Sequence, residues 1–457
     1  MTLPRNNSSE YQLVVRADRV LIDGAWRSAA IGVRDGVIVA IEPVGTPLAA
    51  ATDVTLAADE VLIPGVVDTH VHVNEPGRTH WEGFATATIA AAAGGVTTII
   101  DMPLNSLPPT TTVPALNLKR EATAGQLSVD VGFWGGAIPS SVGHLEPLHD
   151  AGVFGFKAFL SPSGVDEFPH LTRAQLTAAL AETKAFGSMV IVHAEDPDEL
   201  NAHAHPGGVN YADFVASRPD SSEALAIDTI IGAVRETGGR AHILHLSSAS
   251  ALPAIRAAKA EGLDLTVETC PHYLTFAAEQ IPDGATAFKC CPPVRGEANR
   301  ELLWEALVDG TIDIVASDHS PATHELKLGA DGDFARAWGG ISGLQVSLAG
   351  VATGAALRGI PLETAVGWMT AKTSAFVGLS DRGAIEVGRR GDLVAFAPKR
   401  EWQVNVDDLL HRNRVSAFDG SSLTGITTRT WLAAEQVFPA APDAPLRGQL
   451  LSRPRGR

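Results

Sequence analysis

Cysteine is scarce in this chain of 457 residues, which has only Cys270, Cys290 and Cys291, the last two of them adjacent. Three thiols cannot form a disulfide framework, so the sequence predicts a reducing, cytoplasmic setting. Positive charge is also in deficit, because 35 Lys and Arg residues stand against 52 Asp and Glu residues and give a net charge of −17. This balance argues against general binding to nucleic acids or to anionic membranes.

Long hydrophobic runs are absent as well. No uninterrupted apolar stretch reaches the roughly 18 residues that a transmembrane helix needs, and the first twenty residues lack the apolar core of a secretion signal. The chain has 45% hydrophobic and 19% charged residues, a globular composition with enough apolar material for a large core. Its length predicts two or three domains, or one barrel with an accessory unit.

The middle of the chain alternates between short apolar runs and helix-like stretches. This rhythm predicts an α/β fold, a (β/α)8 TIM-type barrel, rather than an open doubly wound sheet, because no glycine-rich nucleotide fingerprint follows the first strand. The predicted strands are 66–71, 96–101, 129–135, 153–160, 189–194, 241–246, 263–269 and 312–317. The predicted helices are 81–93, 171–186, 222–236, 250–261 and 299–308.

The two ends of the chain share a different texture, in which short β-prone runs are separated by Asp-Gly turns and similar signals. We therefore expect both ends to pair into one small β-sandwich, with the barrel inserted between them. The last residues are rich in Pro and Arg, without periodicity, and could lie on a neighbouring subunit. The predicted division is 1–63 and 381–440 for the sandwich, 64–380 for the barrel and 441–457 for an extended tail.

Polar residues gather at the predicted carboxyl ends of five barrel strands, which is where such barrels carry their chemistry. Two of them are histidines two residues apart, so both imidazoles project from the same face of an extended segment. The others are a lysine within Phe-Gly-Phe-Lys-Ala-Phe-Leu, two further histidines and an aspartate. The set is His70, His72, Lys157, His193, His245 and Asp318.

Each of these residues alone has an ordinary explanation. A single histidine at a strand end is more often packed or hydrogen-bonded, as we expect for His242 and His272, and Asp318 could cap the segment that follows it. Lys157 could extend its ammonium group to water, although its apolar neighbours make a buried ammonium costly. The joint occurrence of all six at one end of the barrel is much harder to explain in this way.

Neutral imidazoles and a carboxylate suit a divalent transition metal, zinc first, with cobalt or manganese as alternatives. A lysine ammonium cannot bind a metal, but a lysine carbamate formed with CO2 offers two oxygens and could bridge two ions. Two metals about 3.5–4 Å apart would hold a bridging hydroxide nucleophile and polarise a carbonyl. Asp318 would then bind one metal and accept the proton of that hydroxide.

These residues and their flanks resemble the cyclic amidohydrolases, the family of dihydroorotase, dihydropyrimidinase (hydantoinase) and allantoinase. The most specific stretch is PGVVDTHVHVNEPGRTHWEGFATATIAAAAGGVTTIIDMPLNSLPPTTT at 64–112, and GFKAFLSPSGVDEFP, VHAED, ILHLSS, ETCPHYL, CPPVR and ASDHSP follow in the family's order. The resemblance implies the barrel with its β-sandwich, a hydrolase, and a homo-oligomer, namely a tetramer. It also implies a binuclear metal site bridged by N6-carboxylated Lys157, with ligands His70, His72, Lys157, His193, His245 and Asp318.

Two departures distinguish the branches of the family. Dihydroorotases have an arginine two residues after the histidine pair, where this chain has Asn74. Dihydropyrimidinases have a tyrosine a few residues after the lysine, whereas the only tyrosines here are Tyr11, Tyr211 and Tyr273. Both departures favour the allantoinase branch, which opens the hydantoin ring of allantoin to allantoate in purine catabolism.

The substrate contacts are less certain from sequence. Asn74, Asn105 and Ser163 are candidates for binding ring amide and ureido groups, although Asx-turn and loop roles fit them equally well. The resemblance adds backbone contacts around Cys291 and Gly340. The alternatives are a hydantoinase or dihydropyrimidinase of broader specificity, or a non-catalytic scaffold, against which the intact ligand set argues. A small-molecule substrate is the partner expected, with neither nucleic acid nor membrane.

Overall fold

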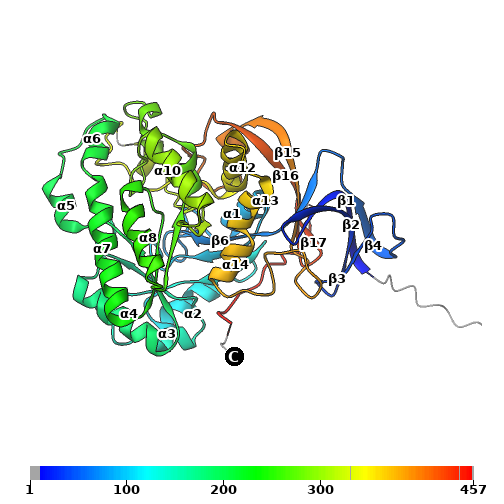
Figure 1. Cartoon of the computed structure of the whole chain (residues 1–457), viewed down its shortest axis with the longest axis horizontal. Coiled ribbons are helices and arrows are strands. Elements are labelled where there is room, and N and C mark those ends of the chain that lie inside the picture. The colour runs from blue at the N-terminus through cyan, green and yellow to red at the C-terminus, as the bar shows by residue number, and fades with distance from the viewer. Residues whose placement is uncertain (1–10, 330, 442, 455–457) are drawn as a thin grey trace, which may run out of the picture.

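The structure is a computed structural model that describes residues 11–329, 331–441 and 443–454. The predicted (β/α)8 barrel is confirmed (Figure 1). One run of parallel strands follows the order β6-β7-β8 and another the order β9 to β14, and β8 and β9 are separated only by Trp134. The last strand returns to the first, because Val71 pairs in parallel with His319 and His72 N–H donates to His319 O at 2.8 Å. The barrel is therefore closed.

The barrel strands are short and almost entirely buried, as expected for parallel strands covered by helices. They are β6 (Val66–Val71), β7 (Val96–Asp101), β8 (Asp130–Phe133), β9 (Gly135–Gly136), β10 (Phe156–Phe159), β11 (Met189–His193), β12 (Arg240–Ile243), β13 (Leu265–Thr269) and β14 (Ile314–Val315). The longer helices are α1 (Phe84–Ala93), α2 (Val113–Ala122), α4 (Arg173–Ala185), α7 (Asp220–Thr237), α8 (Leu252–Ala260), α10 (Glu297–Val308), α12 (Ser347–Leu357) and α13 (Leu362–Met369). Shorter helices are α3 (Glu146–Asp150), α5 (Pro197–Ala202), α6 (Tyr211–Ala216), α9 (Pro271–Thr275), α11 (His324–Leu328) and α14 (Ala371–Phe376).

The two chain ends meet in one eight-stranded sheet, as the sequence predicts. From the N-terminal part, β5 pairs in parallel with β1, and from the C-terminal part β15 pairs antiparallel with β5. The sheet has its own apolar core, which includes Leu13, Val15, Ile31 and Trp431. Its strands are β1 (Tyr11–Ile22), β2 (Ala25–Arg34), β3 (Val37–Glu42), β4 (Ala50–Thr55), β5 (Val61–Pro64), β15 (Leu393–Gln403), β16 (Ser422–Leu432) and β17 (Glu435–Phe438).

The C-terminal tail packs on its own barrel, a contact that the sequence analysis did not predict. Val131 N–H donates to Gln449 O at 2.9 Å, and Leu451 N–H donates to Val131 O at 2.8 Å. The reason is that this edge of β8 is open at Val131, because the chain leading into β10 reaches β8 only two residues later, where Phe154 N–H donates to Phe133 O at 3.0 Å. Buried backbone groups on that edge need partners, and the tail supplies them.

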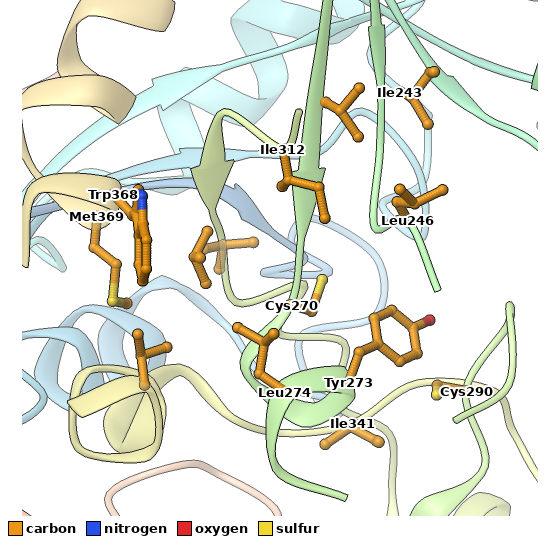
Figure 2. Packing of buried hydrophobic residues seen from close by; sticks show 14 of the residues in the cluster. Ile243, Leu246, Cys270, Tyr273, Leu274, Cys290, Ile312, Ile341, Trp368 and Met369 are labelled. Carbon is orange, nitrogen blue, oxygen red and sulfur yellow. The ribbon is translucent and has the colours of Figure 1, made fainter. Parts of the chain in front are cut away.

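The largest apolar cluster fills the barrel and continues to its helices. Figure 2 shows the part near the carboxyl ends of β12 and β13, where Ile243, Cys270 and Tyr273 lie among other buried side chains. This packing fixes the strand ends that carry the polar residues. Among the described residues, no helix is both long and apolar enough to cross a membrane.

Candidate metal centre and catalytic cavity

Six polar side chains converge at the carboxyl end of the barrel, and all six are buried. His70 lies within β6 and His72 directly follows that strand, while Lys157 lies within β10. The positions of the other three are the last residue of β11 (His193), the second residue after β12 (His245) and the third residue after β14 (Asp318).

Within this cluster, two histidine rings face the carboxylate of Asp318, and two other histidine rings face each other. Asp318 Oδ1 lies 3.0 Å from His70 Nε2 and 3.5 Å from His72 Nε2. On the opposite side, His193 Nδ1 lies 3.1 Å from His245 Nε2. His245 and Asp318 both have positive φ values, of 37° and 45°. Backbone conformations of this kind are costly for residues other than glycine and tend to occur at functional sites.

Most of the histidines are neutral, which is the form that binds metals. Burial lowers the pKa of His72 to about 4, and burial also lowers the pKa values of His193 and His245. Burial opposes the charge of His70 too, but Asp318 and Glu268 outweigh it and raise the pKa of His70 to about 9. Burial would raise the pKa of Asp318, yet the nearby imidazoles hold it well below its usual range, so Asp318 stays ionised.

Lys157 has no hydrogen bond and no salt bridge from its side chain among the described residues, and its Nζ lies 4.6 Å from the centre of the Phe159 ring. Burial lowers the pKa of Lys157 to about 8. A lysine amine of lowered pKa is more often unprotonated and available for covalent chemistry. The lowered pKa increases the fraction of Lys157 in the unprotonated form, which is the form that carbamate formation requires.

Glu268, at the fourth position of β13, orients His70 from behind. Its Oε1 lies 2.5 Å from His70 Nδ1, and its Oε2 lies 3.1 Å from His242 Nε2. Because Glu268 accepts the Nδ1–H of His70, Nε2 is the ring nitrogen of His70 that faces Asp318 and is left for a metal. His242 also contacts Thr266 Oγ1 at 2.8 Å, so it is the hydrogen-bonded core histidine that the sequence analysis expected.

Glu195 orients His193 in the same way, on the other ring nitrogen. Its Oε2 lies 2.7 Å from His193 Nε2, so the Nδ1 of His193 faces His245. Arg218 binds both oxygens of Glu195, with Nε to Oε1 at 2.9 Å and Nη2 to Oε2 at 2.5 Å. Burial would raise the pKa of Glu195, but Arg218 and His193 lower it, so this carboxylate stays ionised.

The arrangement fits the metal centre that the family resemblance implies. The buried His245 Nδ1 has no hydrogen-bond partner among the described residues, and His70, His72 and Asp318 can each direct one ligand atom to a common point. Two carboxylates fix the ring orientations of His70 and His193, as the outer partners of metal-binding histidines do. The donor set of imidazole and carboxylate suits a divalent transition metal.

A cavity of about 370 Å³ opens over this cluster. Four of the five residues predicted to contact substrate line it, namely Asn105, Ser163, Cys291 and Gly340. Ser163 uses its hydroxyl within its own loop, donating to Phe168 O at 2.6 Å. Asn74 does not line the cavity. It is fully buried with a φ of 66°, and its Nδ2 donates to Pro321 O at 3.3 Å.

Three cations line the cavity that the sequence around Asn74 did not indicate, namely Arg218, Lys289 and Arg336. They come from loops far from residue 74 in the sequence, and no local pattern relates them to the histidine pair. The sequence analysis also missed Glu195 and Glu268, although the first is only two residues from His193 and this spacing could have indicated it.

Fold and site together define a metal-dependent hydrolase of the amidohydrolase type, and the sequence comparison agrees. Residues 61–437 match the amidohydrolase family, and the chain belongs to that family. Among solved structures it is similar to the L-hydantoinase (dihydropyrimidinase) from Arthrobacter aurescens, with a TM-score of 0.89, 29% identity, and coverage of 97% of this chain and 100% of the other.

Similar curated proteins are named allantoinases. The one from Streptomyces avermitilis is 54% identical over 97% of this chain and 99% of its own length. The one from Saccharomyces cerevisiae is 43% identical over 93% of this chain and 95% of its own length. A relative from Aquarana catesbeiana, 46% identical over 80% of this chain and 76% of its own length, is named a mitochondrial allantoinase.

Proposed function

We propose that the chain is an allantoinase, which adds water across a ring amide of allantoin and opens the hydantoin ring to give allantoate. The observation that carries the proposal is identity of 54% to an allantoinase over nearly the full length of both chains, combined with the convergent buried site. The site residues support the same reaction class, because neutral imidazoles and an ionised carboxylate surround one end of the cavity.

We further propose that His70, His72, His193, His245 and Asp318 hold two divalent ions, zinc first and cobalt or manganese as alternatives, with N6-carboxylated Lys157 between them. When bound, such ions polarise the amide carbonyl and lower the pKa of water. Asp318 would accept the proton of the attacking water, since it is ionised and lies at the same end of the cavity. The proton would then pass to the ring nitrogen as the C–N bond breaks.

The substrate would be held by polar groups on the cavity wall. Asn105 offers both a donor and an acceptor to an amide or ureido group, while Ser163, Cys291 and Gly340 lie on the same wall. Asn74 would act indirectly, by fixing the loop at Pro321. The tyrosine hydroxyls at Tyr211 and Tyr273 donate to backbone oxygens instead, which fits the absence of the dihydropyrimidinase tyrosine.

The second candidate is a hydantoinase of broader specificity, favoured by the TM-score of 0.89 to an L-hydantoinase. Turnover of allantoin, hydantoin, dihydrouracil and dihydroorotate by the metal-loaded enzyme decides between them. We expect allantoin to give the highest kcat/KM, because its ureido arm adds contacts that hydantoin lacks. A higher value for hydantoin or dihydrouracil would overturn the proposal. We also propose that the protein is a homotetramer in the cytoplasm. Light scattering tests the oligomeric state.

A further inference from the structure

A second cavity of about 250 Å³ adjoins the catalytic one. It lies between the loop at 204–210 and the segment at 334–335, and Phe214 forms part of its wall. The two cavities share three lining residues, Arg218, Lys289 and Ala335. Two cations therefore stand on the wall that the two cavities share.

Glu195 does not use all the N–H donors of the Arg218 guanidinium. Its Nε and Nη2 are occupied by Glu195, but its Nη1 makes no hydrogen bond within the described residues. The side chain keeps 20% of its surface exposed, so that nitrogen is not sealed inside the protein. Through Glu195 the guanidinium is only one carboxylate away from His193. Arg218 thus connects the metal centre with the second cavity.

Lys289 is a buried cation without a carboxylate partner. Its Nζ donates to Ala337 O at 2.6 Å and to Ala335 O at 3.2 Å, and an ammonium group has three N–H donors. No carboxylate in the described part of the chain lies within 4.0 Å of Nζ. Burial lowers the pKa of Lys289, and the like charge of Arg218 acts in the same direction. An anion at this place would relieve both penalties.

Ring opening creates such an anion. The oxygen of water bonds to the amide carbon, the C–N bond breaks, one hydrogen goes to the ring nitrogen, and the new carboxylic acid releases the other as a proton. A neutral cyclic amide therefore becomes a carboxylate at neutral pH. The substrate has no charge to pair with Lys289 or Arg218, whereas the product has one.

We propose that Lys289 and Arg218 form a subsite for the carboxylate of the ring-opened product, at the passage between the two cavities. This inference rests on the proposed function, because the carboxylate arises from that reaction. The subsite binds the product as it leaves the metal centre and orders its exit toward the second cavity. It discriminates by charge and not by shape, so it contributes to product affinity more than to substrate affinity.

The test measures the dissociation constants of allantoate and of its uncharged primary amide by calorimetry on the metal-loaded enzyme. Wild type is compared with Lys289→Met, which removes the charge, with Lys289→Gln, which keeps an N–H for Ala337 O, and with Lys289→Arg, which keeps the charge. Lys399→Met on the sheet domain, an exposed position, is the control. All variants carry the same metals, so any carboxylate preference due to the metals cancels between them.

We expect Lys289→Met and Lys289→Gln to weaken allantoate at least about tenfold, the low end of what a hydrogen bond to a charged group contributes. Binding of the amide should weaken much less than binding of allantoate, and Lys289→Arg should retain tight allantoate binding. Equal weakening of acid and amide would show that Lys289 only supports the loop at 335–337 and would overturn the inference, as would unchanged allantoate binding. Calorimetry needs no turnover, so a failure to hydrolyse allantoin would count against the proposed function alone.

Discussion

Replacing Glu268 by glutamine should separate the role of the metal-binding side chains from the role of the group that orients them. Glu268 accepts from two histidines at once, at 2.5 Å from His70 Nδ1 and 3.1 Å from His242 Nε2. Glutamine has one oxygen acceptor and one NH2 donor, so it can accept from only one of the two rings. Where the NH2 faces His70, the proton of that ring must move to Nε2, which can then no longer bind a metal.

The expected magnitude follows from the contact that is lost. A hydrogen bond to a charged group contributes about 1.5–3 kcal/mol, and substitution of an outer partner of a metal ligand typically costs 10–100-fold in metal affinity. We therefore expect Glu268→Gln to bind metal about 10–100-fold more weakly, with turnover restored toward wild type by excess metal. Removing the carboxylate should also lower the pKa of His70, because Glu268 is one of the groups that raise it.

The assay is competition with a chromophoric chelator, read together with metal content and turnover at increasing metal concentration. Glu261→Gln is the matched control, since Glu261 is exposed and, among the residues that the structure describes, its side chain pairs only with Arg235, at 2.9 Å. Unchanged metal affinity in Glu268→Gln would refute the reasoning, because it would mean that the orientation of His70 does not depend on this carboxylate. A loss of turnover that excess metal does not restore would show that Glu268 affects turnover by a route other than metal affinity.

Three other predictions address the site and the tail. Asp318→Asn keeps a coordinating oxygen but loses the proton acceptor, so turnover should fall at least about 100-fold; wild-type turnover at equal metal content would show another base. Lys157→Ala should abolish binding of the metal pair, measured by elemental analysis, with partial rescue by short carboxylic acids; an unmodified amine in electron density of the metal-loaded protein would contradict this. Deletion of 448–457 should lower the melting temperature, because Val131 loses two backbone hydrogen bonds; an unchanged temperature would show that water replaces the tail.

The fold could be predicted largely because its signals are local. Each barrel strand is a short apolar run that a helix follows, and the observed β6 and β7 have the predicted bounds of 66–71 and 96–101. The contact of the tail with its own barrel was missed for a physical reason. The partner of the tail is the edge of β8 at Val131, which is open because the chain leading into β10 reaches β8 only at Phe133. Sequence periodicity carries no information about that register.

The part of the site that lies at the carboxyl ends of the strands could be predicted from the sequence. His70, His72 and Asp318 meet because strand termini of one barrel share one rim. The cations Arg218 and Lys289 could not be found in this way, because they lie on loops whose course depends on tertiary packing. Asn74 shows the opposite failure, since its sequence position suggested a substrate contact while its backbone conformation turns it toward Pro321.

The junction between the first and last barrel strands explains why the metal centre and the fold depend on each other. Asp68 Oδ1 accepts from His70 N–H at 3.1 Å and from Ser317 N–H at 3.2 Å. One carboxylate therefore joins the first barrel strand to the residue that precedes Asp318. Burial raises the pKa of Asp68 to about 6, and its ionised form is held there by these donors. The residues that complete the ligand set are thus brought together only when the barrel closes, across about 250 residues of chain. Without the last strand, His70 and His72 would face no carboxylate from residue 318.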